Sequence, residues 1–166
     1  APAWFTEGKF GIFIHWGVFS VPEAYSEWYP RHMYREGSPE HEDFKRRFGD
    51  MKHFGYKDLI PIFTAPDFNA DEWMDLFAAA GAKYVTPVAE HHDGFQMYRS
   101  ELSRWNSAEM GPCRDVLGEL KAAAQRRTSS SRGGIMPTPP VRPSRSAPRH
   151  GRPPARRRPL PARRTA

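Results

Sequence analysis

The sequence predicts an α/β fold in which short parallel strands alternate with amphipathic helices. Two apolar runs, residues 10–14 and 84–88, are short and rich in β-branched and aromatic side chains, as buried strands are. Three other stretches repeat apolar residues at helical spacing and carry cap residues at their starts. Near-continuous apolar strands that alternate with such helices are typical of parallel βαβ units whose sheet is covered on both faces.

The first predicted strand is Phe10–Ile14, "FGIFI", which ends where His15 begins. A helix is then predicted after Ser38, an N-cap residue that a proline follows in the first turn. Phe44 and Phe48 stand four residues apart and share a face of this helix, and the next residue, a glycine, ends it.

The clearest predicted helix begins after Asn69. Glu72 stands three residues later, which is the spacing of a capping box. Apolar residues then follow at positions i, i+3, i+4 and i+7, namely Trp73, Leu76, Phe77 and Ala80. Gly81 ends the pattern.

The second predicted strand, Tyr84–Val88, leads into His91 and His92, and Asp115 is positioned to cap a further helix. One face of that helix would carry Leu117, Leu120 and Ala124. In parallel sheets the residues that follow each strand gather at the carboxyl edge, where active sites lie. We therefore expect His15 and the histidine pair to lie close together.

The composition divides the chain at residue 127. Residues 128–166 hold ten arginines and nine prolines but no acidic residue, lysine or aromatic residue. Removing those ten arginines leaves 15 basic and 19 acidic residues in 1–127, so that part carries −4 and the tail +10. We predict a folded part at 1–127 and a low-complexity tail at 128–166 that is disordered or a reading-frame artefact.

Other sequence features exclude some classes of protein. Cys113 is the only cysteine, so the chain has no internal disulfide, and the expected state of this residue is a half-buried small side chain. No apolar stretch approaches the roughly 20 residues of a membrane helix, and Ala1–Phe10 does not look like a secretion signal. A membrane partner is therefore not expected, and the compartment is left undetermined.

The two adjacent histidines allow two interpretations. Adjacent strand residues point to opposite faces, so both imidazoles can reach one pocket only if the strand ends there. In that case they would form hydrogen bonds with a polar ligand. Alternatively, one of them is a histidine packed in the core.

A metal site is a sharper alternative. His91 and Asp93 form a His-x-Asp pair, which together with His15 could make a two-histidine, one-carboxylate iron site. That arrangement normally lies on antiparallel β-structure, whereas the pattern here is βα.

The stretch Tyr25–Tyr29, "YSEWY", has neither helical nor strand periodicity and is predicted to be a loop. Aromatic rings beside a carboxylate are common in sugar sites, although a packed surface loop would explain them equally well. Most glycosidases need two carboxylic acids around the scissile bond. Glu27, Glu90 and Asp93 are the acids near the predicted edge, and their spacing does not select a catalytic pair.

Five motifs occur in an order that resembles the amino end of the family 29 glycoside hydrolases, the α-L-fucosidases. They are "WFTEGKFGIFIHWG", "YSEWYPRHMY", "FNADEWMDLFAAAGAKYV", "EHHDGF" and "WNSAEMGPCRD", and together they cover roughly residues 4–126. The resemblance implies a (β/α)8 catalytic barrel, of which this chain carries the first two strand-helix units. It also implies release of terminal α-L-fucose with retention, through a covalent intermediate on an aspartate, and no metal or organic cofactor.

The resemblance also assigns residues to a fucose pocket: His15, Glu27, Trp28, His91 and His92. The imidazoles and the Glu27 carboxylate would bind sugar hydroxyls, and Trp28 would line the pocket wall. Glu90 and Cys113 stand where a lysine is common in the family.

No part of the tail resembles a family segment, and the nucleophile and acid/base of the family lie on later strands. We therefore expect an α-L-fucosidase fragment that carries no catalytic residue and is inactive alone, with a fucosylated glycan or fucoside as its ligand. The alternatives are the iron protein and an arginine-rich protein that binds nucleic acid through the tail. Nucleic acid is not the expected partner, because no aromatic residue in the tail could stack on bases.

Overall fold

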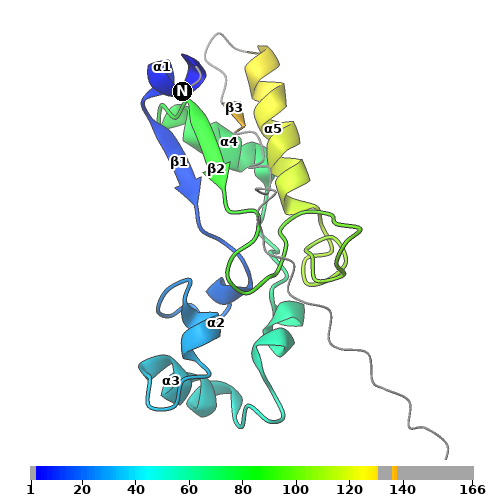
Figure 1. Ribbon diagram of the computed structural model, residues 1–166. Helices are drawn as coiled ribbons and strands as arrows, with labels where there is room; N and C mark the ends of the chain where they lie inside the picture. Colours follow the sequence, from blue (N-terminus) through cyan, green and yellow to red (C-terminus); the bar gives the residue numbers. More distant parts are fainter. Residues whose placement is uncertain (1–2, 131–135, 138–166) are drawn as a thin grey trace, which may run out of the picture.

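The computed structural model describes residues 3–130 and 136–137. In chain order the helices and strands are α1 (Ala3–Gly8), β1 (Gly11–Ile14), the 3-10 helix η1 (Val18–Ser20), α2 (Tyr29–His32), α3 (Pro39–Phe48), the 3-10 helix η2 (Tyr56–Ile62), α4 (Ala70–Ala79), β2 (Tyr84–Pro87), α5 (Val116–Ser130) and β3 (Met136–Pro137). In Figure 1, β1 and β2 run side by side with α4 and α5 next to them, and α2 and α3 lie beyond the carboxyl ends of the strands. The α/β prediction is thus confirmed.

The sheet is parallel and has the order β1-β2-β3. Ile14 pairs with Pro87, so β1 and β2 end at the same level. Gly11 lies opposite Tyr84, and a side chain at this position would meet the tyrosine ring at 2.1 Å. The absence of a side chain at Gly11 therefore allows the two strands to pair at this register.

The third strand was not predicted. Met136–Pro137 pairs in parallel with β2, inside the segment expected to be a disordered tail. Helix α5 also continues to Ser130, past the boundary predicted at residue 127. The rest of that predicted tail, residues 131–135 and 138–166, lies outside the described residues.

The predicted helix caps are confirmed. Ser38 Oγ accepts a hydrogen bond from the backbone N–H of His41 at the start of α3, and Gly49 is the C-cap. Asn69 Oδ1 accepts hydrogen bonds from the first turn of α4. Asp115 Oδ1 accepts one from the backbone N–H of Gly118, which fixes the start of α5.

The core lies between these helices and the buried face of β2. Its fully buried members include Tyr29 and Phe44 from the α2–α3 region, Met74 from α4 and Val116 from α5. Leu76 was expected on the apolar face of α4 but is 65% exposed. The buried face of α4 instead follows Ala70 and Met74, one helical turn apart.

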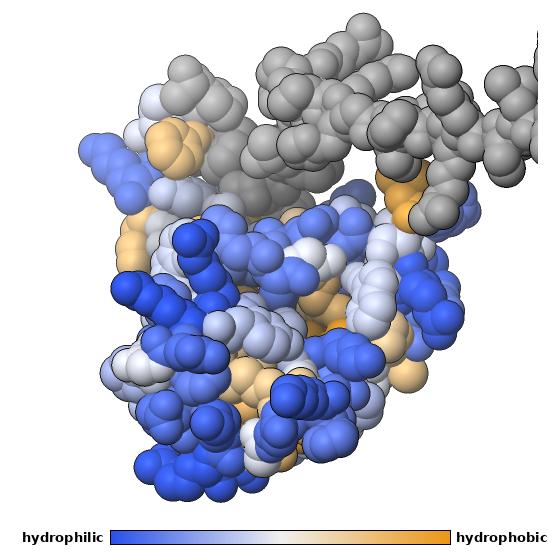
Figure 2. Space-filling model, turned by 60° about the horizontal axis from the view of Figure 1, so that its bottom comes forward, coloured by the Kyte–Doolittle hydropathy of each residue, from blue (hydrophilic) through white to orange (hydrophobic). Residues whose placement is uncertain are grey.

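The first strand is in the predicted place, but it is not buried. Phe13 is 62% exposed and Phe10 is 49% exposed. Among the described residues β1 pairs only with β2, so it is an edge strand with an uncovered face. Apolar surface is exposed elsewhere as well: Figure 2 shows a hydrophobic hollow surrounded by hydrophilic side chains. No helix within the described part of the chain is both long and apolar enough to cross a bilayer.

Candidate functional site

The two parallel strands bring the predicted histidines together at their carboxyl ends. His15 follows β1 directly, and His91 follows β2 after three residues. The backbone N–H of Val88 donates to Ile14 O at 2.9 Å, which keeps the chains paired beyond the last strand residues. The His15 and His91 ring centroids are 5.4 Å apart.

A tight turn explains why both adjacent histidines reach this site. Gly94 adopts a φ of +72°, and its N–H donates to His91 O at 3.0 Å. Because β2 ends at Pro87, the alternation of faces along a strand no longer applies to the pair. The rings of His91 and His92 stand nearly perpendicular, with centroids 4.6 Å apart and an angle of 84°.

Asp93 stabilises this turn, because each of its carboxylate oxygens accepts a hydrogen bond. Its Oδ1 accepts a hydrogen bond from the backbone N–H of Phe95 at 3.1 Å, and its Oδ2 accepts one from the Tyr56 hydroxyl at 2.6 Å. Burial and the neighbouring Asp93 carboxylate raise the pKa of Tyr56 far above its ordinary value. Tyr56 therefore stays protonated and remains a donor.

The loop before α2 supplies an aromatic wall. The ring of Trp28 stacks on that of His92, with centroids 4.2 Å apart and an angle of 26°. Tyr29, the next residue, is fully buried and begins α2, so it fixes the end of the loop. Trp28 remains 40% exposed and presents part of its ring to solvent.

The side chain of Glu27 lies close to His15 and His91. One ligand atom from each of Glu27, His15 and His91 lies within 4.8 Å of the other two. The structure therefore brings together all five residues that the sequence predicted for a pocket, from three separate segments of the chain: His15, Glu27, Trp28, His91 and His92.

The environment of His91 favours its neutral form. Burial, followed by the neighbouring His92 and His15 rings, lowers the pKa of His91, while Asp93 and Glu27 oppose this effect. A neutral imidazole has one donor and one acceptor nitrogen, so it can bind a hydroxyl group in either sense. His91 Nδ1 is buried and has no hydrogen-bond partner among the described residues.

The predicted iron ligands do not assemble. Asp93 is engaged by Tyr56 and Phe95 and does not belong to the group formed by His15 and His91. Glu27 takes the place that the sequence pattern gave to Asp93. Glu90, the third acid near this edge, accepts a hydrogen bond from the Gln96 side chain at 3.2 Å.

Cys113 is exposed, which corrects the expectation of a half-buried side chain. It has a φ of +52°, in the left-handed region, and lies in the turn that precedes α5.

Sequence reasoning missed three aromatic residues that position this site. Phe13 contacts the His15 ring edge-on, with ring centroids 4.4 Å apart. The ring centroids of Phe19 and His91 are 5.2 Å apart. Tyr56 reaches the site from η2. Phe13 stands two residues before His15, a spacing that places both on one face of an extended chain and could have identified it. No local spacing relates Phe19 or Tyr56 to the histidine pair, so the sequence holds no such signal for them.

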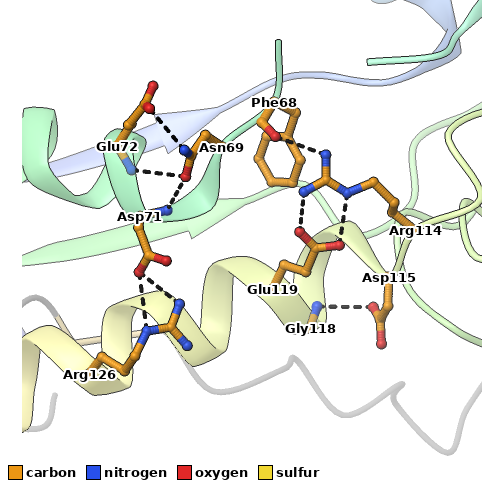
Figure 3. Close-up of polar contacts among 9 residues, drawn as sticks. All are labelled: Phe68, Asn69, Asp71, Glu72, Arg114, Asp115, Gly118, Glu119 and Arg126. Carbon is orange, nitrogen blue, oxygen red and sulfur yellow. Dashed lines mark hydrogen bonds and ion pairs between the residues drawn. The ribbon is translucent and has the colours of Figure 1, made fainter. Parts of the chain in front are cut away.

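A separate cavity of about 680 Å³ lies between the start of α4 and α5, and none of the five residues lines it. Figure 3 shows two ion pairs in its lining, Arg114 with Glu119 and Arg126 with Asp71. Arg114 donates to Phe68 O at 2.8 Å and to Glu119 Oε1 at 3.0 Å, and Arg126 pairs with Asp71 at 2.7 Å. The Arg126–Asp71 pair joins α5 to α4, and the bond from Arg114 to Phe68 O joins the segments that precede the two helices. The cavity is therefore lined by contacts that pack the fold.

Comparison with known proteins gives one consistent family. The family model described as alpha-L-fucosidase matches residues 1–130. Human tissue alpha-L-fucosidase is 51% identical over 127 residues, which are 76% of this chain and 27% of that protein. Human plasma alpha-L-fucosidase is 47% identical over 128 residues, with the same coverage. The matched part thus spans about a quarter of the length of these relatives.

Solved structures agree with this result. The crystal structure of Thermotoga maritima alpha-fucosidase superimposes on this chain with a TM-score of 0.72 at 39% sequence identity. The superposition covers 76% of this chain and 32% of the Thermotoga maritima chain. The complex of the Thermotoga maritima enzyme with fucose gives a TM-score of 0.73 at 38% identity, covering 82% of this chain and 34% of that one.

Proposed function

The chain belongs to the alpha-L-fucosidase family, and from this we propose that it forms the sugar-binding part of an α-L-fucosidase that releases terminal α-L-fucose from fucosylated glycans. The observation that carries the proposal is the convergence of His15, Glu27 and His91 at the ends of β1 and β2, beside the Trp28–His92 stack. Fucose is the ligand of one solved relative.

The geometry suits a sugar. The histidine nitrogens and the Glu27 carboxylate supply donors and acceptors for ring hydroxyls, and the exposed face of Trp28 covers an apolar C–H face. His91, whose pKa is lowered, can donate or accept as the hydroxyl requires. These five residues are therefore proposed as substrate-binding residues.

The acids at this edge do not form a catalytic pair. A retaining glycosidase needs a nucleophile and an acid/base about 5–5.5 Å apart. Asp93 and Glu90 are engaged in hydrogen bonds, and only Glu27 joins the histidines. We infer that the nucleophilic aspartate and the acid/base belong to parts of the family that align outside residues 1–130, and that the 166-residue chain alone has no turnover.

The fold fits the same proposal. Parallel strands followed by helices, with the site at the carboxyl ends, are the units of a (β/α)8 barrel. We propose that residues 1–127 form the first strand-helix units of such a barrel, and that the end of α5 at Ser130 and the strand β3 continue these units. No contact among the described residues favours an iron protein that uses His91 and Asp93. The tail proposed for nucleic-acid binding lies almost wholly outside the described residues.

A chimera tests the proposal. Residues 1–130 would replace the aligned segment of human tissue alpha-L-fucosidase, and hydrolysis of an aryl α-L-fucoside would be measured. We expect turnover by the chimera and none by the 166-residue chain. A folded chimera without activity would contradict the proposed function, and turnover by the 166-residue chain would contradict its inactivity.

A further inference from the structure

The group of His15, Glu27 and His91 also has the composition of a metal site. Two imidazoles and one carboxylate are the protein ligands of many zinc sites that keep a fourth position open for water. The three residues come from separate segments, after β1, before α2 and after β2, and their ligand atoms lie within 4.8 Å of one another. The fold therefore assembles this ligand set without requiring any of the distant acids.

The separations fit a zinc ion after small side-chain movements. Bonds of about 2.0–2.1 Å place tetrahedral ligand atoms about 3.4 Å apart. The ligand atoms of His15, Glu27 and His91 lie at most 4.8 Å apart, so no two of them need to move closer together by more than about 1.4 Å. Glu27 has three side-chain torsions with which to do so, and the exposed ring of His15 is free to adjust on its solvent side.

Each imidazole contacts an aromatic ring and has few competing hydrogen-bond partners. Phe13 contacts the ring of His15, and Phe19 contacts that of His91. Neither the His15 ring nor the Glu27 carboxylate forms a hydrogen bond or ion pair with another residue in the described ranges. His91 Nδ1 is buried and lacks a hydrogen-bond partner there too. Coordination would thus displace no protein hydrogen bond from these atoms.

We propose that this group binds one divalent transition-metal ion, best represented by Zn²⁺, and that the ion and the sugar exclude each other. The ion is an inhibitor of the site and not a cofactor of the reaction. The exclusion rests on the proposed function, because it requires that the same three residues bind fucose. Mg²⁺ should bind much more weakly, since it prefers oxygen ligands in octahedral geometry.

The binding test uses the 166-residue chain and Zn²⁺ in competition with a chromophoric chelator. We expect one ion per chain. The variants His15→Gln, Glu27→Gln and His91→Gln should each weaken binding about tenfold or more, because even outer partners of metal ligands are typically worth 10–100-fold. His53→Gln is the matched control, an exposed histidine outside the site, and should leave the affinity unchanged. Equal affinity for all four variants and the parent chain would overturn the metal site.

Two further measurements keep the proposal testable if a variant does not fold. In the parent chain, Zn²⁺ should shift the ring NMR signals of His15 and His91 and leave those of His53 in place; shifts at His53 alone would overturn the site. In the active chimera, Zn²⁺ should raise the KM for the aryl fucoside without lowering kcat. Zinc binding without such competition overturns the exclusion, whereas an active chimera whose residues 1–130 do not bind zinc overturns only the metal site and leaves the proposed function standing.

Discussion

The Tyr56 hydroxyl donates a 2.6 Å hydrogen bond to Asp93 Oδ2 across 37 residues of sequence. Through this bond η2 holds the turn that carries His91 and His92. The other Asp93 oxygen accepts a hydrogen bond from the backbone N–H of Phe95 in the same turn, so both oxygens are engaged within the protein. Tyr56 is therefore a positioning residue for the histidine pair.

Replacing Tyr56 by phenylalanine should loosen this turn. In the chimera we expect Tyr56→Phe to raise the KM for the aryl fucoside severalfold with a smaller change in kcat, because it displaces binding groups and removes none. Loss of the bond should also lower the free energy of unfolding by about 1–2 kcal/mol. Tyr98→Phe is the control, since the Tyr98 hydroxyl bonds to no described residue. Equal KM values for the two variants would show that Tyr56 does not position the site.

Trp28 should contribute a hydrophobic wall to the sugar site. Trp28→Ala removes a ring that is 40% exposed and stacked on His92. We expect about a tenfold rise in KM, equivalent to about 1.4 kcal/mol. Trp105→Ala, at a similarly exposed tryptophan that contacts no described aromatic ring, should have little effect. If the two variants behave alike, Trp28 does not contact the substrate.

The lowered pKa of His91 makes stability dependent on pH. The unfolded chain takes up this proton near the ordinary value of 6.5, whereas the native chain takes it up only at lower pH. The contribution of His91 is therefore fully present above 6.5 and is lost as pH falls from there toward the lower native pKa. Urea unfolding at several pH values should show a smaller loss of stability on acidification for His91→Gln than for the parent chain. If the free energy of unfolding changes with pH in the same way in both proteins, His91 is not the source of the pH dependence.

Arg114 should be important for stability and not for the sugar site. Its guanidinium binds Phe68 O and Glu119 and lies 4.8 Å from the centroid of the Phe68 ring. We expect Arg114→Met to lower the free energy of unfolding by about 1–2 kcal/mol, measured by chemical denaturation. Arg99→Met is the comparison, because the Arg99–Glu109 pair is 3.6 Å apart and largely exposed. A larger loss in Arg99→Met would contradict this assignment.

The sequence predicted well those features that local chemistry determines. The caps Ser38, Asn69 and Asp115 act on backbone groups within three residues, so their spacing was sufficient to place the helices. The parallel strands placed His15 beside His91, because residues that follow parallel strands meet at one edge.

Features that depend on tertiary contacts could not be predicted in this way. The exposure of Phe13 depends on what covers β1, which the apolar run does not specify. The pairing of Met136–Pro137 with β2 occurs in a segment whose composition is unlike that of a strand. Asp93 does not join His15 and His91, as the iron alternative expected, because the Tyr56 hydroxyl, far away in sequence, binds its carboxylate.

The most direct test of the central claim is the kcat/KM of the chimera carrying His91→Gln, compared with that of the chimera carrying His53→Gln. Both replace a histidine by a neutral side chain, but only His91 belongs to the group with His15 and Glu27. We expect kcat/KM to fall about 100-fold or more in the first, equivalent to about 2.7 kcal/mol, and to be unchanged in the second. Equal values in two folded chimeras would contradict the assignment of this group as the fucose-binding site.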